Sequence, residues 1–147
     1  MLVDFLPISP GGAARVLPLM AQLYAQEAIP YDEIRAARVC ETLLASPECG
    51  AIWMIQADGQ DAGYLVVTVA CSLEFGGRFA LLDELYIADG WRGRGLGPAA
   101  VEFAAAWARE NGMHALRLEV SEENEHARHV YAKSGFHDPH RRILTKL

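Results

Sequence analysis

The stretch of sequence that most constrains the fold is a run of six residues with three glycines, Arg92-Gly93-Arg94-Gly95-Leu96-Gly97. This glycine loop follows a strand-like run, Phe79–Ile87, and precedes a helix-like run, Pro98–Glu110. Because glycines let the backbone turn sharply, successive N–H groups and the positive end of the helix dipole can surround an anion. We therefore expect the loop to bind a phosphate or pyrophosphate group through its backbone. Its spacing also fits a surface turn with solvated arginines.

The size and composition of the chain indicate one globular domain, residues 1–147. With 147 residues, 52% of them hydrophobic and 22% charged, the chain is large enough to bury roughly two thirds of its unfolded surface. No apolar stretch approaches the roughly 18 residues of a membrane span, and Met1–Pro7 lacks a basic leader. We therefore expect a cytoplasmic protein without a membrane partner.

Charge, cysteines and histidines narrow the classes of partner. The net charge of -6 argues against a nucleic-acid partner, because phosphate contacts usually need clustered Lys and Arg, and it favours a cationic acceptor. Cys40, Cys49 and Cys71 are odd in number and fit no close metal spacing, which favours reduced thiols over disulfides. His126 and His129 stand at helical spacing, but no Cys or carboxylate completes a ligand set, so no metal is predicted.

Periodic patterns and turn residues divide the chain into helices and strands. The predicted helices are Ala13–Tyr24, Ile34–Leu44, Pro98–Glu110 and Glu123–Ser134. The predicted strands are Ala51–Gln56, Gly63–Ala70, Phe79–Ile87, His114–Ser121 and Arg141–Lys146. Together they predict a mixed α+β fold in which helices cover both faces of a central sheet.

Two separated motifs carry a resemblance to a known family. The first is Arg-x-x-Gly-x-Gly in the glycine loop, preceded by Leu85-Tyr86-Ile87. The second is Asn124-x-x-Ala127-x-x-x-Tyr131-x-x-x-Gly135-Phe136. In content and order these motifs resemble the GCN5-related N-acetyltransferases, the GNAT superfamily. The resemblance implies a mostly antiparallel sheet that is splayed between its fourth and fifth strands, and acetyl-CoA as the acetyl donor. It also implies a homodimer as a candidate assembly.

The same resemblance assigns the residues that bind the cofactor. It implies that the backbone of Leu85, Tyr86 and Ile87 binds the pantetheine arm like an added strand. The full implied set is Leu85, Tyr86, Ile87, Arg92, Gly93, Arg94, Gly95, Leu96, Gly97, Asn124, Ala127 and Tyr131. By residue type alone, Asn124 is also suited to be a helix N-cap, and Tyr131 is also suited to be a packing residue.

An acidic pair, Asp83 and Glu84, precedes these strand residues. Strict alternation puts Asp83 on the face of Ile87, and Glu84 on the face of Leu82 and Tyr86. The surrounding strand looks like that of the diamine and polyamine N-acetyltransferases. This likeness implies that Asp83 deprotonates the amine or orders a water, and that Glu84 holds a cationic group. A bulge would exchange the two roles, and a structural role for both acids is the alternative.

The predicted reaction moves the acetyl group of acetyl-CoA to a primary amine by direct attack in a ternary complex. Such transfer needs a deprotonated amine, a polarised carbonyl and a proton donor for the departing thiolate. The resemblance implies Tyr131 as that donor, beside Asp83 and Glu84 as the other catalytic residues. The expected acceptor is a small amine or polyamine. A protein lysine or N-terminus, an aminoglycoside-like drug, and a non-catalytic acyl-CoA-binding module are the alternatives.

Overall fold

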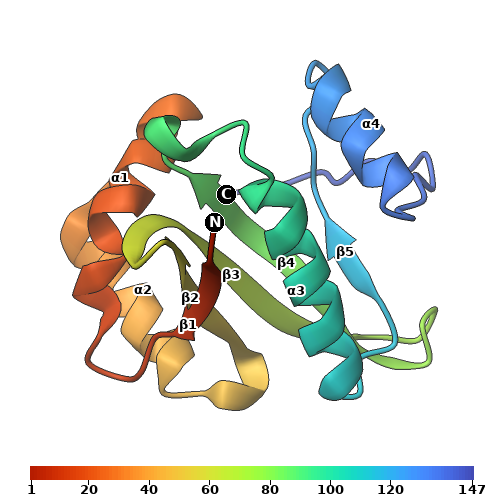
Figure 1. Cartoon of the computed structure of the whole chain (residues 1–147). Coiled ribbons are helices and arrows are strands. Elements are labelled where there is room, and N and C mark those ends of the chain that lie inside the picture. Colours follow the sequence, from red (N-terminus) through yellow and green to blue (C-terminus); the bar gives the residue numbers. More distant parts are fainter.

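The computed structural model describes residues 1–147 as a five-stranded sheet with four α-helices (Figure 1). The strands are β1 (Val3–Pro7), β2 (Gly50–Ala57), β3 (Gln60–Ser72), β4 (Gly77–Ile87) and β5 (Leu116–Leu118). The helices are α1 (Leu17–Gln26), α2 (Glu33–Leu44), α3 (Leu96–Glu110) and α4 (Glu125–Lys133). None of these helices is both long and apolar enough to cross a membrane.

The sheet has the strand order β1-β2-β3-β4-β5, and only its last pair is parallel. β4 pairs with β5 over three residues, Ala80–Leu82 with Leu116–Leu118. Beyond Leu82 the two strands separate, and β4 keeps a partner only on its β3 side. The predicted mixed α+β fold, with a mostly antiparallel sheet splayed between its fourth and fifth strands, is confirmed.

Helices cover both faces of the sheet, as predicted. On one face α1 and α2 bury side chains such as Met20 and Leu44 against Met54 and Tyr64. On the other face α3 packs through buried side chains that are mostly alanines. Burial of these two apolar surfaces is the main source of stability of the fold. α4 lies beyond β5, on the far side of the splay from α1 (Figure 1).

A bulge interrupts the pairing of β4 with β3. Val66 pairs with Glu84 and Val67 pairs with Leu82, so Asp83 is an extra residue without a partner on β3. A bulge of this kind reverses the alternation of side chains along a strand. The faces of β4 before and after Asp83 therefore follow opposite parity.

Because of the bulge, the side chains of β4 lie on faces that differ from those predicted. Leu82 packs in the cluster under α3 together with Leu85 and Ile87, and not on the face of Glu84 and Tyr86. Glu84 and Tyr86 point to the α1 side, where Tyr86 belongs to the other core cluster. Strict alternation was wrong at this point, because the register with β3, rather than the sequence of β4, sets the position of the bulge.

Two predicted strands are shorter than expected or do not form, and one strand forms that was not predicted. The predicted strand His114–Ser121 shrinks to the three residues of β5, and Arg141–Lys146 forms no strand. Ile143 in that terminal segment is 73% exposed, and the segment pairs with no strand of the sheet. β1 was not predicted, and it forms by pairing with the edge of β2. Alternation shows the tendency to form a strand, but a partner edge decides whether the strand exists.

Candidate active site

The glycine loop joins β4 to α3 and presents unpaired backbone donors. Gly93 and Gly95 have φ angles of 74° and 82°, in the left-handed region that glycine favours. None of the N–H groups from Gly93 to Gly97 donates a hydrogen bond to a protein acceptor. A Cβ added at Gly93, Gly95 or Gly97 would meet no protein atom within 4 Å. These donors at the start of a 15-residue helix face open space, and they fit a phosphate or pyrophosphate group.

The splayed half of β4 presents a second set of backbone groups. The Ala88 N–H donates to the Ala62 carbonyl at 2.9 Å, so the even-numbered residues of this half pair with β3. The N–H and C=O groups of Leu85 and Ile87 consequently point into the gap between β4 and β5. β5 does not reach them, because its pairing with β4 ends at Leu82. This edge is suited to bind an extended, strand-like ligand.

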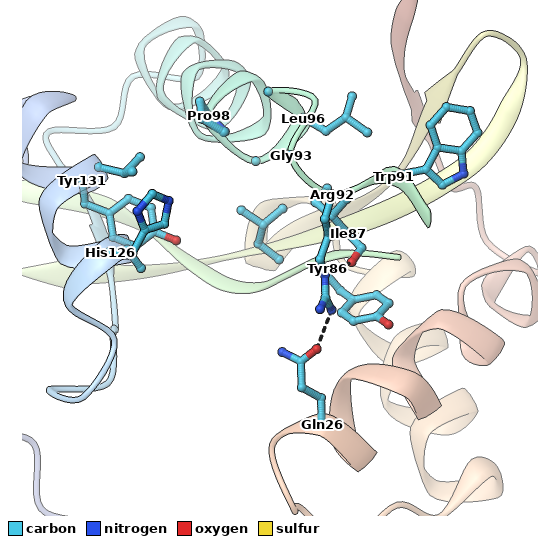
Figure 2. Close-up of a pocket in the computed structure, with 15 residues that line it drawn as sticks. Gln26, Tyr86, Ile87, Trp91, Arg92, Gly93, Leu96, Pro98, His126 and Tyr131 are labelled. Atoms are coloured by element: carbon cyan, nitrogen blue, oxygen red, sulfur yellow. Dashed lines mark hydrogen bonds between the residues drawn. The ribbon is translucent and has the colours of Figure 1, made fainter. Parts of the chain in front are cut away.

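Both sets of backbone groups border one cavity of about 460 Å³ between β4, α3 and α4 (Figure 2). Ten of the twelve residues expected to bind the cofactor line this cavity, namely Leu85, Tyr86, Ile87, Arg92, Gly93, Gly95, Leu96, Gly97, Ala127 and Tyr131. Arg94 and Asn124 do not line it. The lining residues that the sequence did not single out as cofactor ligands are Gln26, Trp91, Pro98, His126 and Val130.

The two arginines of the glycine loop are bound to other protein groups. Arg92 Nε donates to the Ile87 carbonyl at 2.9 Å, and its guanidinium also donates to Gln26 on α1 (Figure 2). The guanidinium of Arg94 lies over the ring of Trp91, 4.9 Å from the ring centroid. These contacts engage both arginine side chains, whereas the backbone N–H groups of the loop have no protein partner.

Tyr131 on α4 brings a free hydroxyl group to the cavity. Its ring packs edge-on against Phe136, with the ring centroids 5.9 Å apart. Burial raises the pKa of the phenol above its ordinary value, and no protein group hydrogen-bonds to the hydroxyl. The phenol therefore keeps its proton at neutral pH and is available as a donor to a ligand in the cavity.

Asn124 is the N-cap of α4. Its Oδ1 accepts a hydrogen bond from the Ala127 N–H at 3.0 Å, which satisfies one of the free donors at the start of the helix. Ala127 lines the cavity, whereas Asn124 lies outside its lining. The capping role expected from the residue type is therefore present, and the cofactor role of Asn124 stays a prediction.

The acidic pair directly precedes Leu85, which lines the cavity, but lies outside the lining itself. Asp83 is exposed, yet neighbouring protein atoms partly desolvate its carboxyl and raise its pKa above the ordinary value. Glu84 is half-buried and accepts hydrogen bonds from the hydroxyls of Tyr24 and Tyr64 at 2.6 and 2.7 Å. The structure thus gives the two acids different surroundings, one without a hydrogen-bond partner and one with two.

The histidines and cysteines do not assemble into a metal site. No group of three or more His, Cys, Asp or Glu side chains is arranged to hold a metal ion. His126 is the one histidine in the lining of the cavity, and His129 lies outside the lining. Cys40 is buried, Cys49 and Cys71 are exposed, and all three thiols are free.

Two curated proteins with related sequences are streptothricin acetyltransferases. The enzyme of that name from Streptomyces lavendulae is 34% identical over 82 residues, which are 56% of this chain and 41% of that protein. Streptothricin acetyltransferase A from Bacillus subtilis (strain 168) is 38% identical over 58 residues, which are 40% of this chain and 34% of that protein. This chain matches less than half of the length of either relative.

A solved structure and a family model also match this chain. The crystal structure of an integron cassette protein from the mobile metagenome of Cole Harbour Salt Marsh matches with a TM-score of 0.85 and 27% identity. That match covers 97% of this chain and 89% of the other. The model of the Acetyltransferase (GNAT) family matches residues 17–136. The chain therefore belongs to the GNAT family of acetyltransferases, as the two sequence motifs predicted.

Proposed function

We propose that this protein is an N-acetyltransferase that moves the acetyl group of acetyl-CoA to a primary amine by direct attack in a ternary complex. One observation carries the proposal. The unpaired N–H groups of the glycine loop, the open edge of β4 and the free hydroxyl of Tyr131 border the same cavity. Acetyl-CoA supplies a pyrophosphate, an extended amide-containing arm and a reactive thioester, one for each of these three features. Membership of the GNAT family supports the same chemistry.

The binding roles follow from the backbone groups that the fold leaves free. The N–H groups of the glycine loop hold the pyrophosphate, assisted by the dipole of α3. The free edge of β4 at Leu85 and Ile87 holds the pantetheine arm, although the Ile87 carbonyl already accepts a hydrogen bond from Arg92. Tyr86 between them lines the cavity, but its own backbone groups pair with β3. By the family resemblance, Asn124 and Ala127 at the start of α4 contact the same arm from the opposite side of the splay; the Ala127 N–H is bonded to Asn124, so this role does not rest on a free backbone group.

The chemical roles follow from the surroundings of the three titratable side chains. Tyr131 donates a proton to the departing thiolate, because its phenol is neutral and unpaired. Asp83 removes a proton from the acceptor ammonium, directly or through a water, since amines with pKa values near 10 are protonated at neutral pH. From the sequence, a bulge in β4 is expected to exchange the roles of the two acids, and β4 has a bulge at Asp83. The two phenols that bind Glu84 keep Asp83 as the candidate base and leave Glu84 to hold a cation.

The proposed acceptor is a small amine or polyamine. Neither Asp83 nor Glu84 forms an ion pair within the protein, so a cationic ligand supplies the missing positive charge. The names of the two streptothricin acetyltransferases support a small molecule as the acceptor. The three free thiols support a reducing compartment, the cytoplasm, as the place of the reaction. The homodimer stays a prediction.

The test is a direct search for the acetylated product. The protein and acetyl-CoA are incubated with each of four acceptors: a monoamine, a diamine, a streptothricin, and a peptide with a free N-terminus and one lysine. Products are identified by mass, because the exposed thiols of Cys49 and Cys71 would react with the reagents that detect free CoA.

The four acceptors separate the candidate functions. Acetylated diamine, monoamine or streptothricin supports the proposal, and transfer confined to the peptide would assign the protein to the protein acetyltransferases. A protein that binds CoA tightly but acetylates no acceptor would be an acyl-CoA-binding module, and the proposal would be wrong.

A further inference from the structure

Two tyrosines from different elements hold Glu84 on the α1 side of β4. The Tyr24 hydroxyl, from α1, donates to Glu84 Oε2 at 2.6 Å, and the Tyr64 hydroxyl, from β3, donates to Oε1 at 2.7 Å. Each oxygen of the carboxylate thus accepts one short, charge-assisted hydrogen bond. We name Tyr24, Tyr64 and Glu84 the Glu84 cluster. Its two donors fix the carboxylate in one orientation.

No positive side chain neutralises the Glu84 cluster. The ion pairs of the protein include neither Glu84 nor its neighbour Asp83. The other titratable groups that face the cluster are Asp83 on the same strand, Cys40 on α2 and Tyr31 between the first two helices. None of these groups is a cation. A half-buried carboxylate in these surroundings attracts a positively charged ligand.

The helix that carries Tyr24 is also bound to the cavity. Gln22 accepts a hydrogen bond from the Tyr86 hydroxyl at 3.0 Å, and Gln26 accepts one from Arg92 (Figure 2). Tyr86 and Arg92 both line the cavity. These two contacts on either side of Tyr24 fix the C-terminal turn of α1 against β4. The Glu84 cluster is therefore held at a set place, two residues before Tyr86 on the strand that borders the cavity.

Resting on the proposed acetyltransferase function, we propose that Tyr24 is a positioning residue that determines acceptor specificity. With Tyr64 it orients the Glu84 carboxylate to bind a second ammonium group of the acceptor, while the first ammonium is the one that is acetylated. Asp83, which no hydroxyl holds, is left for proton transfer. Tyr24 acts through Glu84 and does not touch the reacting atoms. The acceptor class is then a compound with two ammonium groups.

The test compares a diamine with a monoamine of the same length, 1,5-diaminopentane and 1-aminopentane. Tyr24→Phe removes one hydrogen bond to Glu84 and keeps the ring. We expect the KM for the diamine to rise about tenfold, the loss expected for one hydrogen bond to a charged group. We expect kcat for the diamine and KM for the monoamine to stay near their wild-type values. A purely structural role of Tyr24 would change both acceptors alike and would overturn the proposal.

A double-mutant cycle tests whether Tyr24 acts through Glu84. In the Glu84→Gln background, Tyr24→Phe should cause no further rise in the KM for the diamine. Additive effects of the two substitutions would contradict the proposal. Tyr31→Phe is the matched control, because its hydroxyl donates to the Leu17 carbonyl at 3.2 Å and not to Glu84. This control should keep the wild-type ratio of the two KM values.

A folding control and the wild-type enzyme itself separate the possible outcomes. Stabilisation by CoA in a thermal unfolding assay shows whether each variant is folded. If Tyr24→Phe does not fold, Glu84→Gln alone must lose the preference for the diamine, and a retained preference refutes the cation site. A wild-type enzyme that acetylates the monoamine as well as the diamine also refutes it. The proposed function itself fails if the wild-type enzyme acetylates no acceptor at all, or only the peptide.

Discussion

Gly97→Ala should raise the stability of the free protein and weaken its binding of CoA. Gly97 is the second residue of α3, its φ lies outside the left-handed region, and an added Cβ would meet no protein atom within 4 Å. The substitution therefore strains neither the backbone nor the packing. Alanine is up to about 1 kcal/mol more favourable than glycine in a helix. In a domain of this size that difference raises the melting temperature by about 2–4 °C.

The same methyl group enters the space that the cavity leaves for a ligand, because Gly97 lines it. At a CoA concentration of one hundred times Kd, the wild-type protein should gain about 2.7 kcal/mol of stability. Loss of one backbone hydrogen bond to a charged phosphate costs about 1.5–3 kcal/mol. One such loss would abolish most of the stabilisation by CoA at that concentration. The variant should thus melt higher than wild type without CoA and gain much less when CoA is added.

Thermal unfolding with and without CoA measures both effects in one experiment. Gly90→Ala is the matched control, since a Cβ at Gly90 also meets no atom within 4 Å and Gly90 lies outside the cavity lining. The control should show the wild-type shift with CoA. If Gly97→Ala gains as much from CoA as the wild-type protein does, the glycine loop is not the pyrophosphate site.

Substitutions at three further residues test the other proposed roles. Tyr131→Phe should lower kcat by about 10²–10⁴-fold, the usual worth of a general acid, with little change in the Kd of CoA; an unchanged kcat in a reaction limited by chemistry would leave only a packing role. Asp83→Asn should lower kcat at neutral pH and regain part of the loss at high pH, where free amine is abundant; a wild-type pH profile would exclude Asp83 as the base. Because partial desolvation raises the pKa of the exposed Asp83 carboxyl in the folded state, wild-type stability falls slightly as pH rises through the range between its ordinary and raised values. The same substitution should therefore raise the melting temperature at pH 7 but not below that range. Asn124→Ala should lower the free energy of unfolding by about 1 kcal/mol, because it removes the helix cap. Asn124→Asp keeps the cap and removes only the amide. If the Asp variant binds CoA as tightly as wild type, the amide of Asn124 has no part in binding.

The part of the site that was predictable from sequence is the part that depends on local structure. A strand, a glycine loop and a helix that follow one another in the chain fix their own geometry, so Gly93, Gly95 and Gly97 reach the cavity as expected. The cap at Asn124 is also local, because its partner Ala127 lies three residues further on. Such features need no knowledge of the rest of the fold.

The part that was not predictable depends on contacts between distant segments. The bulge at Asp83 arises from the register between β3 and β4, and strict alternation within β4 carries no sign of it. Tyr24 and Gln26 reach β4 and the glycine loop only because α1 packs across the sheet. The failed prediction of a strand at Arg141–Lys146 has the same cause, since alternation does not reveal whether a partner edge exists.

The most direct test of the proposed binding mode is a titration of the isotopically labelled protein that follows its backbone amide resonances by NMR. The titration is made once with CoA and once with pantetheine, which lacks the pyrophosphate. We expect CoA to shift the amide resonances of Gly93–Gly97 as well as those of Leu85 and Ile87, and pantetheine to shift only the latter two. If CoA leaves the resonances of Gly93–Gly97 unchanged while it binds elsewhere, the glycine loop does not hold the pyrophosphate and the proposed binding mode is wrong.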